Sequence, residues 1–339
     1  MRCSRVLIGL LAAACALVVA GCSAGVPVES PTSETPSSSP DVETTPTPTV
    51  SLPTVTLTDA TSVSVTGDFN TFPTVTAPYP FKVDTTICKT LIQGDGVEVG
   101  DSSVLELQYT GIDATSGQTF DSSFYKQQTL LGQNGEFVTG FNNCLTGQKT
   151  GSRVLMLISS ADGYDASGGQ SDAGIAVGDS LLFVVDVIAS QYSGPVGQHM
   201  ADGDQWVTVT DTDGVPTAKV NPGMAAPTEL QSTVLTQGTG RAIAVGDAIY
   251  VNFFTMDYST GAMIENSYTD GNGPQVGLLA NMIPGWRDVL VGVPMGSRVL
   301  IIVPGNLAYP QGNATPSIAP NTTLVCVVDI LFSFVPQAQ

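Results

Sequence analysis

The sequence has few basic residues and almost no histidine. Lys and Arg number 11 against 30 Asp and Glu among 339 residues, which gives a formal net charge of −19. A nucleic-acid-binding protein needs clustered basic side chains to replace phosphate counterions, and no such cluster occurs. The single histidine, His199, is expected to stand in a Gly-rich linker, so we do not expect a Ser-His-Asp or Cys-His hydrolase. Without a C-x-x-C pair or a histidine cluster, we expect neither a metal site nor a cofactor.

Long apolar runs are also scarce. The run over residues 6–20 is too short for a comfortable membrane span, but it follows Arg2 and Arg5 as in an export signal. It ends in "VAGC", whose last residue is Cys22. This end resembles a bacterial lipobox, and the resemblance implies cleavage after residue 21 and lipidation of Cys22. The alternative is an ordinary signal peptide with an incidental cysteine. We expect an exported protein held on the outer face of the cell membrane through Cys22.

Residues 22–60 are rich in Ser, Thr and Pro and cannot build a core, which predicts a disordered tether. If the chain is exported, Cys88 and Cys144 can form a disulfide and leave Cys326 as a buried free thiol.

An internal repeat follows the tether. "GSRVLMLIS" from Gly151 matches "GSRVLIIVP" from Gly296, and "LLFVVDVI" from Leu181 matches "LVCVVDIL" from Leu324. Further pairs occur in the same order, which indicates a duplicated domain rather than a short-period array. We expect a first domain over 61–195, with its core at 84–192, and a second over 196–339, with its core at 228–335. Each domain begins with a strand-like prelude.

Within each repeat the pattern favours strands. Runs such as "SVLELQYTGI" and "SLLFVVDVIA" are rich in Val, Leu and Ile and are bounded by Gly and Asp. One short helix is expected from Gly140 to Gly147, which closes it. The predicted fold class is α+β, with an antiparallel sheet and one short helix in each domain.

The first repeat contains, in order, "GDGVEVGD", "QYTG", "TFDSS", "FVTGF", "GSRVLMLIS" and "SLLFVVDV". This series resembles the FKBP-type peptidyl-prolyl cis-trans isomerases over about residues 84–192. The resemblance implies a sheet wrapped across a short helix and a proline-binding pocket. The pocket residues that it implies are Tyr109, Phe120, Asp121, Phe137, Val138, Phe141, Tyr164 and Phe183.

The resemblance also implies roles for these residues. Aromatic side chains form a cup for the proline ring, while the Tyr164 hydroxyl and the Val138 N–H donate to substrate carbonyls. Asp121 accepts from Tyr109, and Phe141 replaces the tryptophan that is usual at the pocket floor. The alternative for each aromatic residue is an ordinary core position, and for Asp121 a turn cap.

The second repeat retains the pattern with changes in the pocket. The counterparts that we expect there are Phe254, Ile264, Glu265, Ile283, Trp286 and Tyr309, with Cys326 replacing the last-strand aromatic. Loss of the Phe-Asp pair suggests a weak or inactive isomerase that binds extended chain or supports the first repeat.

The function that we expect is proline isomerisation in exported proteins, carried out mainly by the first repeat. Its partners would be unfolded or extended proline-containing polypeptides, and the sequence leaves macrolide binding open. The alternative is a non-catalytic surface chaperone or protein-binding module on the same fold.

Overall fold

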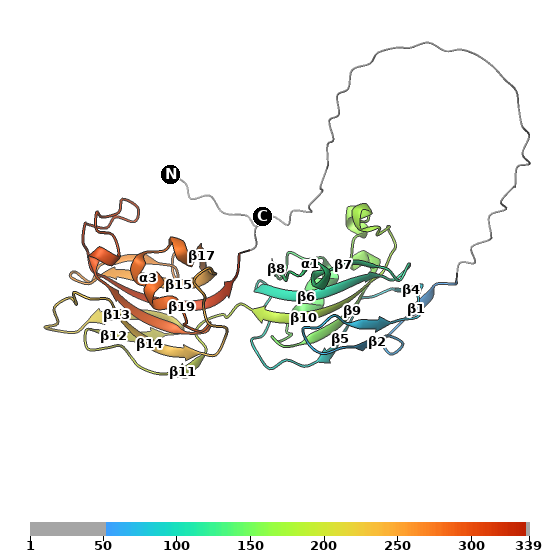
Figure 1. The fold of residues 1–339 in the computed structure, drawn as a ribbon, viewed down its shortest axis with the longest axis horizontal. Helices are drawn as coiled ribbons and strands as arrows, with labels where there is room; N and C mark the ends of the chain where they lie inside the picture. Colours follow the sequence, from blue (N-terminus) through green and yellow to red (C-terminus); the bar gives the residue numbers. More distant parts are fainter. Residues whose placement is uncertain (1–51, 337–339) are drawn as a thin grey trace, which may run out of the picture. The chain divides into compact units, whose positions relative to one another are not determined.

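The computed structural model describes residues 52–336. The first of its two large sheets carries the first repeat (Figure 1). Its strands are β5 (Ile87–Ile92), β6 (Val104–Asp113), β7 (Thr119–Ser122), β8 (Leu130–Gln133), β9 (Arg153–Ile158) and β10 (Leu181–Ser190). They lie in the order β5-β9-β10-β6-β7, with β8 also paired to β6, and every pairing is antiparallel.

The second sheet carries the second repeat. Its strands are β11 (Gly197–His199), β14 (Gln231–Gly238), β15 (Ala248–Asp257), β16 (Met263–Asn266), β17 (Gln275–Leu278), β18 (Arg298–Val303) and β19 (Leu324–Phe334). Their order is β11-β14-β18-β19-β15-β16, with β17 also paired to β15. Apart from β11, this is the order of the first sheet, so the structure confirms the duplicated α+β fold. His199 lies in β11 and not in a linker.

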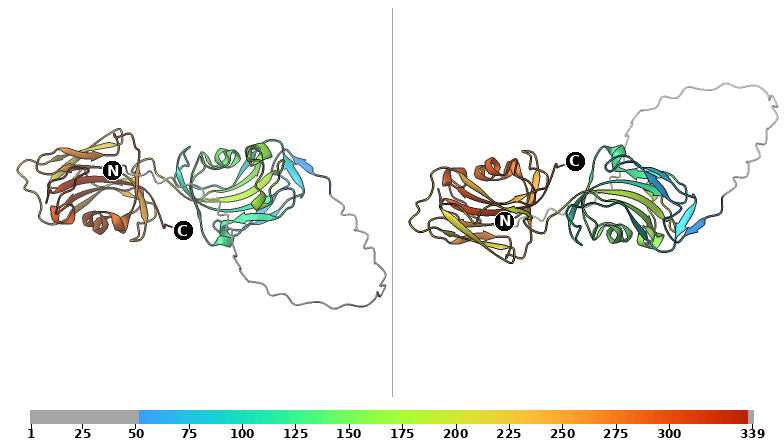
Figure 2. Two further views of the ribbon diagram at one scale, coloured as in Figure 1. Left: turned by 90° about the horizontal axis from the view of Figure 1, so that it is seen from above. Right: turned by 90° about the horizontal axis from the view of Figure 1, so that it is seen from below.

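A short helix crosses one face of each sheet. These helices are α2 (Thr139–Leu145) and α3 (Pro284–Leu290), and α2 begins and ends near the helix expected at Gly140–Gly147 (Figures 1 and 2). A Cβ on Gly140 would lie 2.5 Å from a methyl carbon of Ile158, so glycine lets α2 approach β9 closely. The four-residue α1 (Ser123–Lys126) was not expected from the sequence. Short 3-10 turns occur at η1 (Ser160–Asp162), η2 (Asp165–Ser167), η3 (Ser171–Ala173), η4 (Leu279–Asn281) and η5 (Gly305–Leu307).

The opposite face of each sheet is covered by the prelude that precedes the repeat. In the first repeat, β1 (Val55–Leu57) pairs with β4 (Phe81–Val83), and β2 (Ser64–Thr66) pairs with β3 (Thr74–Thr76). The buried Phe81 and Val83 pack in one cluster with Leu155 and Leu157 of β9. In the second repeat, the hairpin of β12 (Val207–Thr212) and β13 (Val215–Val220) has this position.

Covering both faces explains why the central strands read as unbroken apolar runs instead of alternating. All six residues of β9 and all six of β18 are buried. The predicted tether was too long at its C-terminal end, because β1 begins at Val55 and both Leu57 and Ala60 are buried. Residues 1–51, which include the expected signal peptide, Cys22 and most of the tether, lie outside the described residues. None of the helices within residues 52–336 is long and apolar enough to cross a membrane.

A buried ion pair connects the first prelude to its sheet. Arg153 is 1% exposed and donates two 2.7 Å hydrogen bonds to Asp186, which is also 1% exposed. The guanidinium also donates to the carbonyl oxygens of Gly67 and Thr71, both at 2.7 Å. The second carboxylate oxygen of Asp186 accepts from the Asn70 N–H at 2.8 Å. The loop between β2 and β3 therefore supplies partners that the ion pair needs in order to be buried.

The second repeat contains the same arrangement. Arg298 donates to Asp329 at 2.6 and 2.8 Å and to the Gly214 carbonyl oxygen at 2.9 Å, and it also bonds Asp211. Both Asp211 and Gly214 belong to the β12–β13 hairpin.

Replacing Arg153 tests how much this pair stabilises the first sheet. We expect Arg153→Met to lower the opening free energy of β9 and β10 by about 3–5 kcal/mol, because Asp186 is left as an uncompensated buried charge. Amide hydrogen exchange of these strands measures that free energy. Adding Asp186→Leu should restore most of the loss in the strands.

The matched control is Lys82→Met, which removes the exposed Lys82–Asp84 pair and should cost less than about 1 kcal/mol. Equal effects of the two single substitutions would show that apolar contacts alone hold the prelude.

Candidate functional site

Aromatic rings gather around Phe183 on β10, on the face of the sheet that α2 crosses. Phe183 meets Phe120 edge-on at 5.5 Å between ring centroids and Phe141 edge-on at 5.1 Å. Phe137 lies 5.3 Å from Phe141, and Tyr109 lies 6.4 Å from Phe183. The structure therefore brings together all five aromatic residues of this group, and Val138 and Tyr164 pack in the same cluster.

Asp121 lies at the edge of this group and is held by two donors. The Tyr109 hydroxyl donates to Asp121 Oδ2 at 2.6 Å, and Lys126 Nζ lies 2.7 Å from Oδ1. Burial alone would raise the pKa of Asp121, but the hydrogen bonds from Lys126 and Tyr109 outweigh it and hold the pKa below 3.8. Burial first, and then the hydrogen bond to Asp121, raise the pKa of Tyr109. Near neutral pH the pair is therefore a fixed carboxylate and a neutral phenol.

Two donors next to the aromatic group have no acceptor. Within residues 52–336, neither the Tyr164 hydroxyl nor the Val138 N–H donates a hydrogen bond. Val138 is the residue that precedes α2, where backbone N–H groups lack helical acceptors. Burial and then the Asp121 carboxylate raise the pKa of Tyr164, so its hydroxyl keeps its proton. Both groups can donate to carbonyl oxygens of a bound chain.

A disulfide fixes the helix that contributes Phe141 to this group. Cys88 on β5 and Cys144 on α2 are joined, with a Cα–Cα distance of 5.3 Å and a sequence separation of 56. This is the pair predicted from the sequence. Cys326, as expected, is a free and buried thiol.

Two glycines that the sequence analysis did not single out make room for the rings. A Cβ on Gly111 would lie 2.7 Å from ring carbons of both Phe120 and Phe183. A Cβ on Gly132 would lie 2.6 Å from the ring of Phe137. The glycines of "YTG" and "LLG" were visible in the sequence, but the rings that they accommodate lie on other elements: Phe120 on β7, Phe183 on β10 and Phe137 in the loop before α2. Spacing alone could not reveal these contacts.

The second repeat forms a cavity of about 320 Å³ at the corresponding place. Glu265, Ile283, Trp286, Tyr309 and Cys326 line it, and Ile264 packs against the same core. The prediction that Phe254 lines this pocket was wrong by one position. Phe253 lines the cavity and meets Trp286 at 5.2 Å, whereas Phe254 is fully buried with Val327 on the opposite face. Neighbouring residues of a strand point to opposite faces, so a shift of one residue exchanges the two.

The structure also shows how the second repeat compensates for its missing rings. Thr255 pairs with Cys326 across two strands, as Gly111 pairs with Phe183 in the first repeat. The Thr255 hydroxyl lies 3.5 Å from Cys326 Sγ. A small residue beside a large ring has thus become a larger residue beside a small thiol, so the volume lost at one position is partly regained at the other.

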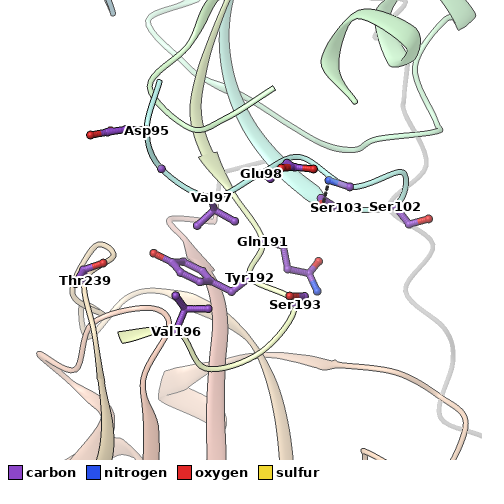
Figure 3. A pocket seen from close by; sticks show the side chains of 12 residues that line it. Asp95, Val97, Glu98, Ser102, Ser103, Gln191, Tyr192, Ser193, Val196 and Thr239 are labelled. Carbon is purple, nitrogen blue, oxygen red and sulfur yellow. Dashed lines mark hydrogen bonds between the residues drawn. The ribbon is translucent and has the colours of Figure 1, made fainter. Parts of the chain in front are cut away.

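No group of His, Cys, Asp and Glu that could hold a metal ion occurs in the described part of the chain. A larger cavity of about 720 Å³ is lined mainly by the polar loops 95–103 and 191–196 (Figure 3). None of the residues predicted for either pocket lines it, so its size alone does not make it the site.

Replacing Gly111 and Phe183 by Thr and Cys, their counterparts in the second repeat, tests whether the two changes compensate for each other. We expect Gly111→Thr alone to destabilise the first repeat by about 1–3 kcal/mol, because the added atoms collide with Phe120 and Phe183. Adding Phe183→Cys should recover part of that loss, so that the two changes are non-additive by about 0.5–3 kcal/mol. Hydrogen exchange of β6 and β10 measures Gly111→Thr, Phe183→Cys and the double variant, and strict additivity of the two single effects would contradict compensation.

Comparison with known proteins agrees with this geometry. The model of the family described as FKBP-type peptidyl-prolyl cis-trans isomerase matches residues 96–188 and 240–331. The chain is 35% identical over 104 residues to FkpA of Escherichia coli K12, covering 31% of this chain and 37% of FkpA. It is 31% identical over 112 residues to the FK506-binding protein of Streptomyces anulatus, covering 32% of this chain and 90% of that protein.

Among solved structures, the three FKBP domains of wheat FKBP73 align with 16% identity and a TM-score of 0.31, covering 73% of this chain and 94% of that one. The chain spans little more than a third of FkpA, while the family model matches more than half of the chain. The protein therefore belongs to the FKBP-type peptidyl-prolyl cis-trans isomerase family and carries two copies of its domain.

Proposed function

We propose that the first repeat isomerises X-Pro bonds in exported polypeptides and that the second repeat binds extended chain. The observation that supports it most directly is the aromatic group around Phe183, which adjoins a fixed Asp121 carboxylate and two free donors. Resonance in the planar amide sets a barrier of about 18–20 kcal/mol to rotation. Lowering this barrier needs no metal or nucleophile, only better binding of the twisted amide than of the planar one.

Different residues of the first repeat would bind the proline ring and the neighbouring carbonyl groups. Phe120, Phe141 and Phe183 would hold the proline ring and exclude water from the amide, whose charge separation falls as it twists. The Tyr164 hydroxyl and the Val138 N–H would hold carbonyl oxygens on either side of the bond. Since the Tyr109 hydroxyl is occupied by Asp121, its role would be to position that carboxylate.

Matched substitutions in the two repeats of the full-length chain test this assignment. We expect Asp121→Ala with Tyr164→Phe to lower kcat/KM for a proline tetrapeptide by at least about tenfold, because a positioned donor is lost. The matched control, Glu265→Ala with Tyr309→Phe, should leave the rate nearly unchanged. A protease-coupled isomerisation assay measures both variants.

The opposite result would place the activity in the second repeat. If the unaltered chain itself does not accelerate isomerisation, the alternative applies, in which both repeats are non-catalytic binding modules. The second repeat's cavity and the polar segment "KQQT" near the first repeat's pocket favour that alternative.

We further propose that the protein acts outside the cell membrane, held by lipid on Cys22. The "VAGC" sequence after an apolar run supports this, and one relative, at 25% identity over 148 residues, is named outer membrane protein MIP of Legionella longbeachae. Cys22→Ser should move the protein from the membrane fraction to the soluble fraction, because the acyl chains contribute about 0.8 kcal/mol per buried CH₂. Membrane retention of this variant would show that lipid on Cys22 is not the anchor.

A further inference from the structure

The cavity of the second repeat combines aromatic walls with a carboxylate that has no partner. Trp286 is 7% exposed, and the one partner of its indole N–H within the described residues is the buried Cys326 thiol, a weak acceptor. Phe253, Met282 and Tyr309 line the same cavity, and Glu265 is its one acidic lining residue. A volume of about 320 Å³ is at the lower end of the range for ligand pockets and suits one or two side chains.

Comparison of the repeats shows why Glu265 is unpaired. The Tyr109 N–H donates to Ser123 Oγ, and the Phe253 N–H donates to Ser267 Oγ, both at 2.8 Å. These equivalent bonds align the two segments. Phe253 therefore replaces Tyr109, so the hydroxyl that donates to the carboxylate in the first repeat is lost.

The same alignment shows that a basic residue beside the first pocket is replaced by an acidic residue beside the second. Three residues beyond the aligned serines, the first repeat has Lys126 and the second has Asp270. Lys126 forms an ion pair with Asp121, whereas Glu265 forms neither an ion pair nor a hydrogen bond within residues 52–336. Burial and then the charge of Asp270 raise the pKa of Glu265.

An unpaired, half-buried carboxylate next to a second acid favours a cationic ligand. A Lys or Arg side chain can lay its methylene groups along Phe253 and Trp286 and bring its charge to Glu265. A neutral or acidic side chain in the same place leaves the carboxylate without a donor, which costs free energy. The overall charge of −19 adds long-range attraction for basic chains.

We propose that the pocket of the second repeat selects extended chains in which Lys or Arg adjoins a proline held over Trp286, with Glu265 as the specificity-determining residue. This rests on the proposed chain-binding role of that repeat and names the class of chain that it takes. The first repeat, whose carboxylate already has Tyr109 and Lys126 as donors, lacks this preference.

Fluorescence of Trp286 gives a direct test. The sequence has two tryptophans, Trp206 and Trp286, so Trp206→Phe in the full-length chain leaves a probe in this pocket alone. Blocked peptides with the central sequences Lys-Pro-Lys, Leu-Pro-Leu and Glu-Pro-Glu are titrated. We expect the lysine peptide to bind at least about tenfold more tightly than the leucine peptide, as one charge-assisted hydrogen bond would give. The glutamate peptide should bind most weakly.

Three variants separate contact from long-range charge. Glu265→Gln should remove most of the lysine preference, and Asp270→Lys should reduce it by supplying the missing counter-ion. Glu98→Gln, which removes one exposed acid from the first repeat, should leave it unchanged. Retention of the preference in Glu265→Gln, or its complete loss at about 0.5 M salt in the unaltered pocket, would overturn the proposal.

The outcomes also separate this inference from the proposed function. Equal binding of the three peptides would overturn the cation preference and leave the chain-binding role intact. No change in Trp286 fluorescence with any peptide would overturn both. Isomerase activity of the first repeat is measured independently and is unaffected by either result.

Discussion

Burial of both faces of each sheet is the constraint on which the rest of this structure depends. Strands β9 and β18 are buried along their whole length, so each sheet needs a cover on either side. The helix covers one face and leaves room beside it for a pocket, while the prelude covers the other. The buried Arg-Asp pair connects the sheet to the prelude, because prelude groups accept from its remaining donors. These acceptors are the Gly67 and Thr71 carbonyl oxygens in the first repeat, and the Gly214 carbonyl oxygen and the Asp211 carboxylate in the second. Each prelude is therefore part of the folded domain and not a linker.

The sequence was sufficient for the fold class and the duplication, because ordered motifs and unbroken apolar runs carry that information locally. The disulfide followed from the expected export and the small number of cysteines. The sequence was insufficient for contacts between distant segments. The room that Gly111 makes depends on Phe120 and Phe183, which lie in other strands. Likewise, Arg153 could be read as one charge in a strand, but its partners lie as far away as Gly67. The slip between Phe253 and Phe254 arose because two adjacent phenylalanines fit the motif equally well, and only the register of β15 with β19 distinguishes their faces.

The two pockets differ by a small number of coupled changes. Gly111 and Phe183 of the first repeat correspond to Thr255 and Cys326 of the second. Tyr109 and Lys126, the two donors to Asp121, correspond to Phe253 and Asp270, so the equivalent acid, Glu265, has lost both donors. In the first change the larger Thr255 partly offsets the volume lost at Cys326, and both side chains line the cavity. The second has no such compensation within the described residues, so Glu265 remains without a partner.

The unpaired Glu265 indicates why the second copy of the domain has been retained. A domain kept only as support would gain stability from losing an unpaired, partly buried acid, because a polar group removed from water without a donor is destabilising. Natural proteins tend to place such locally unfavourable groups where function requires them. Within the described residues, an open cavity, a buried tryptophan and an unpaired carboxylate occur together in the second repeat. Their combination is better explained by a ligand that supplies the missing positive charge than by decay of a former active site.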